Sequence, residues 1–294
     1  MSPRIALSAL QQRDFLTGTG RYIAETFRAL GPIAPQHEFS LYIKPDQTRL
    51  YPTSTSNTRH RLAEGCPSSP PRRALWELLH FDRMLRQDGI DLYHGPANFL
   101  PPRKSCPFVL TLHDLVYFHN PGRTFFLRAK YWQYYIRSTW RMADAILTVS
   151  EFSKREIIRY LGVPADMIHV VHNGVDQRFL TPAPASEREA MRAANRLDFP
   201  YILYVGRLDP DKNVDALIEA YALLLARGLK DWKLVIAGAK EFRTSTTFGL
   251  VEKFKLQDRV VFTGHIGEDH LVPLYQEAAA FCYPSLNEGF GLPV

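Results

Sequence analysis

Short apolar runs alternate along the chain with segments in which apolar residues recur every three or four positions. The first pattern is typical of buried β-strands and the second of amphipathic α-helices. Strands are predicted at residues 5–10, 39–43, 92–94, 108–112, 145–149, 169–172, 201–205, 233–237, 259–263 and 280–283. Helices are predicted at residues 20–30, 74–87, 125–141, 153–161, 213–227, 247–255 and 268–277. This alternation predicts an α/β fold with parallel sheets and right-handed crossovers.

Two stretches interrupt the pattern. Residues 47–73 are rich in Thr, Ser, Pro and Arg without clear periodicity, which indicates a long irregular segment. Residues 181–186 (TPAPAS) indicate a linker, and a length of 294 residues suits about two domains. We therefore expect two Rossmann-like domains, residues 1–182 and 183–294, that face a cleft. Ligands of such sheets bind at the carboxyl ends of the strands.

The composition is that of a folded protein, because 46% of the residues are hydrophobic. No apolar stretch approaches the ~18 residues of a spanning helix, and the N-terminus lacks the pattern of a cleaved export signal. Cys66, Cys106 and Cys282 lie far apart and form no CxxC pair. This spacing argues against a disulfide framework and a thiolate zinc site, so we expect a cytoplasmic protein.

Charge is unevenly distributed along the chain. Residues 1–183 carry 23 Lys and Arg against 15 Asp and Glu, whereas residues 184–294 carry 13 against 15. A basic first part favours an anionic partner, such as phosphorylated substrates or an acidic membrane face, although charge that serves solubility explains the same surplus. Nucleic acid is disfavoured because no recognition motif accompanies the charge.

The helix predicted at residues 125–141 concentrates seven aromatic and four basic residues. Tyr, Trp and Arg on a basic face suit a membrane interface. The alternative is a helix packed across the first domain, which we favour because Tyr131, Tyr135 and Met142 fit a buried stripe.

A first candidate motif follows the strand predicted at residues 201–205. Gly206 ends this strand and lets the backbone approach a ligand, and Arg207 and Lys212 flank the loop that opens the next helix. Two cations beside a helix N-terminus can bind a diphosphate without a metal ion. An exposed loop with solvated charges is the alternative explanation of the same residues.

A second candidate motif occupies residues 284–293. Gly289 and Gly291 leave backbone N–H groups accessible at the start of an expected helix, where they can hold a phosphate. Glu288 can accept hydrogen bonds from sugar hydroxyls. A turn with a capping carboxylate is the alternative.

The two motifs lie about 80 residues apart on successive strand ends. Together they resemble those of the retaining glycosyltransferases of the GT-B fold, glycosyltransferase family 4, and most closely the mannosyltransferases of bacterial surface-polysaccharide assembly. The resemblance covers the whole chain. Its further elements are residues 18–22, 94–96, 111–115, 150–154 and 173–176.

The resemblance implies transfer of a hexose, with mannose favoured, from a nucleotide-diphosphate sugar to a lipid-linked or oligosaccharide acceptor in surface-polysaccharide biosynthesis. Anomeric configuration is retained, by front-face attack in which the departing phosphate takes the acceptor's proton. In the family, residues that match Arg207 and Lys212 bind the diphosphate, and the residue that matches Glu288 contacts the donor sugar. Sugar and phosphate face the backbone amides of four residues, Gly289, Phe290, Gly291 and Leu292.

The first domain is implied to contribute Gly18 and Gly20, in a loop near the phosphates, and His113 near the reacting sugar. A buried strand-end histidine held for structural reasons is the alternative for His113.

The resemblance implies no metal ion and no other cofactor. Asp209 and Asp211 have Asp-x-Asp spacing but lie inside the Arg/Lys loop. The cysteine usage predicts a cytoplasmic protein, and the basic aromatic segment at residues 125–141 leaves peripheral binding at the inner face of the cell membrane open.

One departure concerns the family's second glutamate, which binds the nucleotide ribose eight positions beyond the residue that matches Glu288. That position is 296, and the chain has 294 residues. We therefore expect an incomplete second domain with an uncovered edge at residues 280–283 and weak donor binding. Two other functions stay open: an inactive nucleotide-sugar-binding fragment, and a sugar-nucleotide epimerase, which shares the two-domain architecture.

Overall fold

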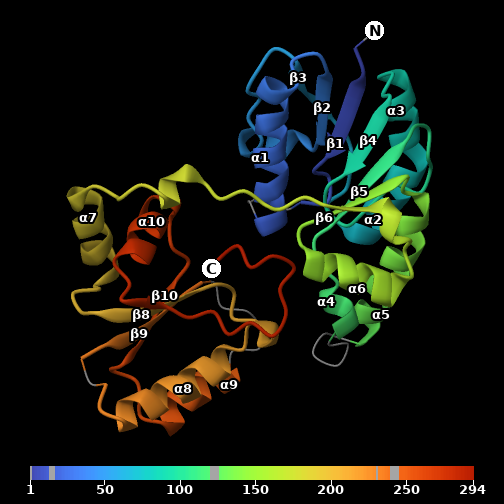
Figure 1. Cartoon of the computed structure of the whole chain (residues 1–294). Helices are drawn as coiled ribbons and strands as arrows, with labels where there is room; N and C mark the ends of the chain where they lie inside the picture. Colours follow the sequence, from blue (N-terminus) through green and yellow to red (C-terminus); the bar gives the residue numbers. More distant parts are fainter. Residues whose placement is uncertain (1, 13–16, 120–125, 230, 239–244) are drawn as a thin grey trace. The chain divides into compact units, whose positions relative to one another are not determined.

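The computed structural model describes residues 2–12, 17–119, 126–229, 231–238 and 245–294 (Figure 1). The chain divides into two compact units, Met1–Asn173 and Gly174–Val294, which we call unit 1 and unit 2. Each unit contains a parallel sheet covered by helices, which confirms the α/β fold. The linker expected at residues 181–186 lies inside unit 2.

Unit 1 is built on a seven-stranded sheet in the order β3-β2-β1-β4-β5-β6-β7, in which all neighbours are parallel. The strands are β1 (Arg4–Ser8), β2 (Glu38–Ile43), β3 (Thr58–Leu62), β4 (Leu92–Gly95), β5 (Phe108–Leu112), β6 (Ala145–Thr148) and β7 (Ile168–Val170). The α-helices are α1 (Gly18–Ile33), α2 (Pro70–Trp76), α3 (Asp82–Gln87), α4 (Val116–His119), α5 (Phe126–Thr139) and α6 (Glu151–Leu161).

Helices cover both faces of this sheet. On one face Phe27 of α1 belongs to a core cluster with Leu41 of β2. On the other face Ile136 of α5 and Ile157 of α6 share a cluster with Tyr42. Leu41 and Tyr42 point to opposite faces because successive side chains of a strand alternate. With both faces buried, the central strands are continuous apolar runs, which is why the sequence locates them.

The segment at residues 47–73 is partly regular, which corrects the irregular structure expected from its sequence. It contains β3 and the start of α2. β3 has the sequence TRHRL and lies at the edge of the sheet, where charged side chains are typical and no apolar pattern is needed. Arg59 pairs with Glu38 at 3.2 Å, and Arg61 pairs with Asp88 at 3.2 Å.

The helix that precedes β4 is continuous from α2 to α3 through a π-helical turn at Glu77–Phe81. A π turn changes which side chains face inward. Leu75 and Leu79 are more than half exposed, whereas Arg73 and Glu77 are buried. Their side chains form an ion pair at 3.7 Å.

Burial raises the pKa of Glu77 to about 7, although Arg73 and a hydrogen bond with Gln11 act in the opposite direction. The folded protein therefore binds this proton more tightly than the unfolded chain, whose glutamates titrate near ~4.3. Protonated Glu77 therefore stabilises the folded state fully below pH ~4.3, and this stabilisation is lost as the pH rises through about 7.

We expect Glu77→Gln to remove this dependence, because glutamine resembles the protonated side chain at every pH. Relative to the wild type, the variant's unfolding free energy should rise by about 3 kcal/mol between pH 4.5 and pH 7.5. Urea melts at several pH values measure this difference, with the exposed Glu64→Gln as control. A difference that stays constant with pH would contradict the prediction.

Unit 2 is built on a four-stranded parallel sheet in the order β10-β9-β8-β11. The strands are β8 (Tyr201–Val205), β9 (Lys233–Ala237), β10 (Val260–Gly264) and β11 (Ala280–Phe281). The helices are α7 (Ala185–Asn195), α8 (Val214–Ala226), α9 (Ser245–Lys253) and α10 (Glu268–Gln276). α8 and α9 pack side by side, and α7 packs on α10 (Figure 1). Within the described residues, β11 pairs with β8 alone and so forms an edge.

Residues 181–186 do not form a free linker, which corrects the sequence interpretation. The Ala183 N–H donates to Gln276 Oε1 at 2.7 Å, and Gln276 Nε2 donates to the Thr181 carbonyl oxygen at 2.8 Å. One amide side chain at the end of α10 thus holds this segment, and α7 begins within it at Ala185.

The aromatic helix is α5; Phe125, where it was expected to begin, lies outside the described residues. Trp132 and Tyr135 pack on Phe99 with ring centroids 4.9 and 5.0 Å away. Tyr131 is 46% exposed and Tyr134 73% exposed, so Tyr131 is not part of a buried stripe. Within the described residues, no helix has the length and apolar character needed to cross a membrane.

Candidate functional site

The loop after β8 carries Arg207 and Lys212 at the carboxyl edge of the unit 2 sheet. It begins where the Gly206 N–H donates to the Ala237 carbonyl oxygen at 2.9 Å, which continues the ladder with β9. A 3₁₀ turn then closes when the Lys212 N–H donates to the Asp209 carbonyl oxygen at 3.0 Å. Asn213 has a left-handed conformation, with φ of 55°, and leads directly into α8.

Lys212 and Glu288 are brought into contact although they lie 76 positions apart in sequence. The Lys212 ammonium donates to Glu288 Oε1, and the two side chains are 18% and 27% exposed. A backbone bond supports this contact, because the Leu286 N–H donates to the Asp211 carbonyl oxygen at 2.9 Å. The two sequence motifs therefore form one patch on unit 2.

Arg207 lies on the same loop and is largely exposed. Its guanidinium pairs with Asp209 at 2.7 Å. One carboxylate of the Asp-x-Asp spacing is thus engaged by an arginine. Among the described residues, no group of three or more His, Cys, Asp and Glu side chains is placed to hold a metal ion.

Two stacked tyrosines lie against these residues, and the sequence analysis did not identify them. The rings of Tyr204 and Tyr283 are 5.6 Å apart at 18°. The Tyr204 hydroxyl donates to the Arg207 carbonyl oxygen at 2.9 Å, and the Lys212 ammonium lies 5.7 Å from the Tyr283 ring centroid. Burial, with the negative charge of Glu288, raises the pKa of both phenols. The sequence offered one sign of these residues: Tyr204 lies just before the Arg207 loop, and Tyr283 directly precedes the motif at residues 284–293.

Gly206 and Gly238 are glycines for steric reasons. A β-carbon at Gly206 would lie 2.7 Å from the Tyr204 hydroxyl and 3.3 Å from the Tyr283 ring, so the tyrosines occupy the space beside it. A β-carbon at Gly238 would lie 1.9 Å from the Gly206 carbonyl oxygen, and Gly238 has φ of +153°. Gly238, also missed from the sequence, therefore lets the end of β9 approach the start of the Arg207 loop.

The segment after Glu288 has no helical start in the described residues, which corrects the expected helix. Residues 289–294 form bends and a turn. Gly291 has φ of +85°, a left-handed conformation that interrupts helical geometry. Gly289 is buried, whereas Phe290 and Leu292 are exposed.

In unit 1, Gly18 and Gly20 lie in the first turn of α1 and not in a loop, which corrects the expectation. Thr17 caps this helix: its hydroxyl accepts a hydrogen bond from the Gly20 N–H at 3.2 Å. Gly18 is exposed and Gly20 is buried. The N-terminus of a helix favours an anion, so this turn keeps the character expected of a phosphate-facing segment.

His113 follows β5, at the same edge of unit 1 as the first turn of α1. Its Nε2–H donates to the Pro96 carbonyl oxygen at 2.8 Å, and its ring meets that of Tyr22 from α1 edge-on at 4.6 Å. Burial lowers the pKa of His113, and burial lowers the pKa of the neighbouring His94 to about 4. Burial therefore favours the neutral form of His113, whose ring is held by these contacts, and its place beside a reacting sugar stays a prediction.

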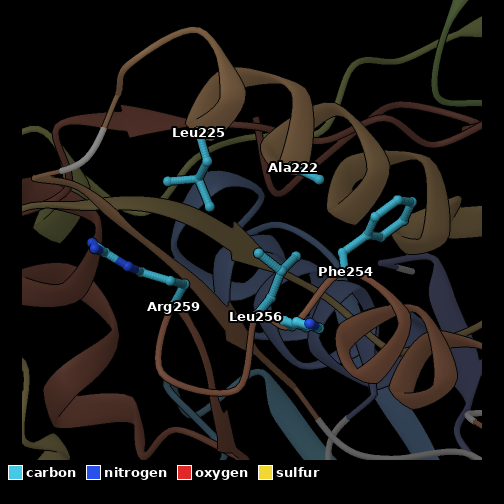
Figure 2. A pocket seen from close by; sticks show the side chains of 6 residues that line it. Ala222, Leu225, Phe254, Leu256 and Arg259 are labelled. Atoms are coloured by element: carbon cyan, nitrogen blue, oxygen red, sulfur yellow. The ribbon is translucent and has the colours of Figure 1, made fainter.

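A separate cavity of about 380 Å³ lies between the end of α8 and the segment after α9 (Figure 2). It is lined by Ala222, Leu225, Phe254, Lys255, Leu256 and Arg259. Arg259 directly precedes β10, so this cavity is at the amino edge of the sheet. Arg207 and Lys212 follow the carboxyl end of β8 and belong to the opposite edge.

Two family models match the chain. The model described as Glycosyltransferase Family 4 matches residues 16–179, and the model described as Glycosyl transferases group 1 matches residues 187–294. The O-antigen chain mannosyltransferase B of Escherichia coli is 30% identical over an alignment of 288 positions, which covers 95% of this chain and 75% of that protein.

Solved structures of the same architecture are also similar. Sucrose-phosphate synthase from Thermosynechococcus elongatus has a TM-score of 0.75 and 19% identity, over 99% of this chain and 77% of that one. Anabaena HepE in complex with UDP and glucose has a TM-score of 0.69 and 17% identity, over 98% and 76%. The fold is that of the GT-B glycosyltransferases, two Rossmann-like domains. The chain belongs to glycosyltransferase family 4 and is a glycosyltransferase.

Proposed function

We propose that this chain transfers mannose from a nucleoside-diphosphate donor to a lipid-linked or oligosaccharide acceptor in surface-polysaccharide synthesis, with retention of configuration. The observation that carries the proposal is the ion pair of Lys212 with Glu288, on the patch that also holds Arg207. Lys212, which can bind the diphosphate, is in direct contact with Glu288, which can accept hydrogen bonds from sugar hydroxyls. The name of the Escherichia coli relative supports mannose and an O-antigen acceptor.

The reaction follows from where charge develops. The bond between the anomeric carbon and the diphosphate oxygen breaks, which leaves negative charge on the diphosphate and positive character on the sugar. Arg207 and Lys212 stabilise the diphosphate, which is usually the largest catalytic contribution of such a site. The acceptor oxygen bonds to the same face of the anomeric carbon, and its proton passes to the departing phosphate oxygen.

Incubation of the chain with a panel of nucleotide sugars and a lipid-linked acceptor tests the proposal. We expect a mannosylated product whose anomeric configuration, read by NMR, equals that of the donor. EDTA should leave the rate unchanged, since we propose that no metal or other cofactor takes part. A donor that binds unreacted would identify a binding fragment, and an isomerised donor would identify an epimerase.

We further propose that unit 1 lies at the inner, anionic face of the cell membrane while it binds a lipid-linked acceptor. The support is the exposed face of α5, where Lys130, Tyr134 and Arg137 lie beside the half-exposed Tyr131. Aromatic rings with basic side chains suit a lipid headgroup layer, and residues 1–183 carry a surplus of basic residues.

Vesicles that contain anionic lipid should sediment the chain at low salt. Lys130→Glu should weaken this binding about 30-fold, because it changes the charge by two units and each unit charge near the surface contributes about 1 kcal/mol. The control is Lys253→Glu, at an exposed position in unit 2. Equal sedimentation with neutral vesicles, or an equal effect of both variants, would exclude membrane binding through α5.

A further inference from the structure

The loop after β4 folds back onto the end of β5, where His113 lies. A β-carbon at Gly95 would lie 2.1 Å from the Phe99 carbonyl oxygen, so this path requires glycine. Asn98 has φ of 63°, a left-handed conformation that asparagine adopts more readily than most residues. Its backbone N–H donates to the Thr111 carbonyl oxygen at 3.0 Å, and its Oδ1 accepts from the His113 N–H at 2.9 Å. Asn98 therefore bonds to two alternate residues at the end of β5.

His113 is held by its backbone and by one of its two ring nitrogens. Its carbonyl oxygen accepts a hydrogen bond from the Ser153 hydroxyl at 3.3 Å, and its Nε2 lies 2.8 Å from the Pro96 carbonyl oxygen. Because a carbonyl oxygen only accepts hydrogen bonds, Nε2 carries the ring proton. Within the part of the chain that the structure describes, no hydrogen bond reaches Nδ1 of His113.

The position of this proton determines which group can bind to Nδ1. A neutral imidazole that is protonated on Nε2 has a lone pair on Nδ1, which accepts a hydrogen bond and cannot donate one. Burial lowers the pKa of His113 and so favours the neutral ring. A partner of Nδ1 must therefore be a hydrogen-bond donor. The hydroxyl groups of a sugar meet this requirement, and the unprotonated oxygens of a diphosphate do not.

We propose that Asn98 is a positioning residue that holds His113 with Nε2 bound to Pro96 and with Nδ1 presented to a hydroxyl group of the transferred sugar. This inference rests on the proposed function and on the predicted place of His113 beside the reacting sugar. Asn98 acts through the backbone of His113 and does not itself contact the sugar. Without its Oδ1, the His113 N–H loses its partner, and the loop that carries the Pro96 carbonyl oxygen is held less firmly.

Nitrogen NMR of the full chain with isotope-labelled histidine tests the geometry without turnover, and the loss of a signal in His113→Ala assigns the ring. We expect a protonated Nε2 and an unprotonated Nδ1 for His113 at neutral pH. Asn98→Gly keeps the left-handed backbone and removes Oδ1, so it should produce a mixture of the two tautomers. A wild-type ring that is protonated on Nδ1, or a spectrum that Asn98→Gly leaves unchanged, overturns the proposal.

Kinetics with the donor test whether this arrangement serves the reaction. Asn98→Gly should lower kcat/KM about fivefold, the size of one hydrogen bond, and should leave the affinity for GDP and UDP unchanged, because their phosphate oxygens offer Nδ1 no proton. Asn98→Asp keeps an oxygen for the His113 N–H and should recover most of the activity. The matched control is Arg196→Gly, at an exposed left-handed residue of unit 2 with φ of 55°, which should behave like the wild type.

A double variant separates positioning from a merely structural role. If Asn98 acts through His113, adding Asn98→Gly to His113→Ala changes kcat/KM less than twofold. An equal loss in both backgrounds, or an equal loss of diphosphate affinity and activity, overturns the role of Asn98. A wild-type chain that converts no nucleotide sugar overturns the proposed function and with it the contact to a sugar, and the nitrogen spectra still decide whether Asn98 holds the ring.

Discussion

Lys212→Ala is expected to lower kcat/KM for the donor by about 10²–10³-fold, the usual effect of removing one preorganised group from the position where negative charge develops. Two effects add in this variant. The departing diphosphate loses a cation, and Glu288 loses the ion-pair partner seen in the structure. Steady-state kinetics with the preferred nucleotide sugar measure the loss.

The control is Lys253→Ala, which removes an exposed lysine at the end of α9 and should leave kcat/KM unchanged. Lys212→Arg keeps the charge but not the compact ammonium, so it should recover part of the activity. Full activity of Lys212→Ala, in a protein with wild-type circular dichroism, would remove Lys212 from the reaction.

Gly238→Ala is expected to destabilise unit 2 by about 3–5 kcal/mol, because two costs combine. The new methyl group would lie 1.9 Å from the Gly206 carbonyl oxygen, and that neighbour is backbone that cannot turn away as a side chain does. The φ of +153° also disfavours any residue with a β-carbon. Chemical denaturation measures the loss of stability.

The same exchange at another glycine of unit 2 should have the opposite sign. Gly249 is exposed in α9, and a β-carbon there meets nothing within 4 Å. Gly249→Ala should therefore stabilise the protein by about 0.5–1 kcal/mol through helix propensity. Equal effects of the two variants would show that the close approach of Gly238 to Gly206 does not limit stability.

The central strands were predictable because burial on both faces makes them apolar throughout. β3 was not, since an edge strand is held by backbone pairing with β2 and by ion pairs such as Arg59 with Glu38. The inward face of the helix before β4 was also missed. Its π turn depends on packing around Arg73 and Glu77, which local periodicity does not encode.

For the candidate site, the charged residues could be identified from the sequence, but the tyrosines and the glycine that pack around them could not. Arg207, Lys212 and Glu288 stand in recognisable motifs, and their roles in a reaction stay predictions. Tyr283 meets Tyr204 across β11 and β8, and Gly238 meets Gly206 where β9 and β8 end. Such contacts depend on strand order and register, which one sequence does not specify.

His94 and Glu77, both buried in unit 1, have a joint consequence for acid tolerance. Burial lowers the pKa of His94 to about 4, so His94 favours folding more strongly as the pH rises from about 4 towards ~6.5. Glu77 favours folding less strongly over nearly the same interval. In this pH range His94 releases protons on folding, and Glu77 takes up a similar number. The contributions of these two residues to the pH dependence of folding therefore largely offset each other under mild acidification.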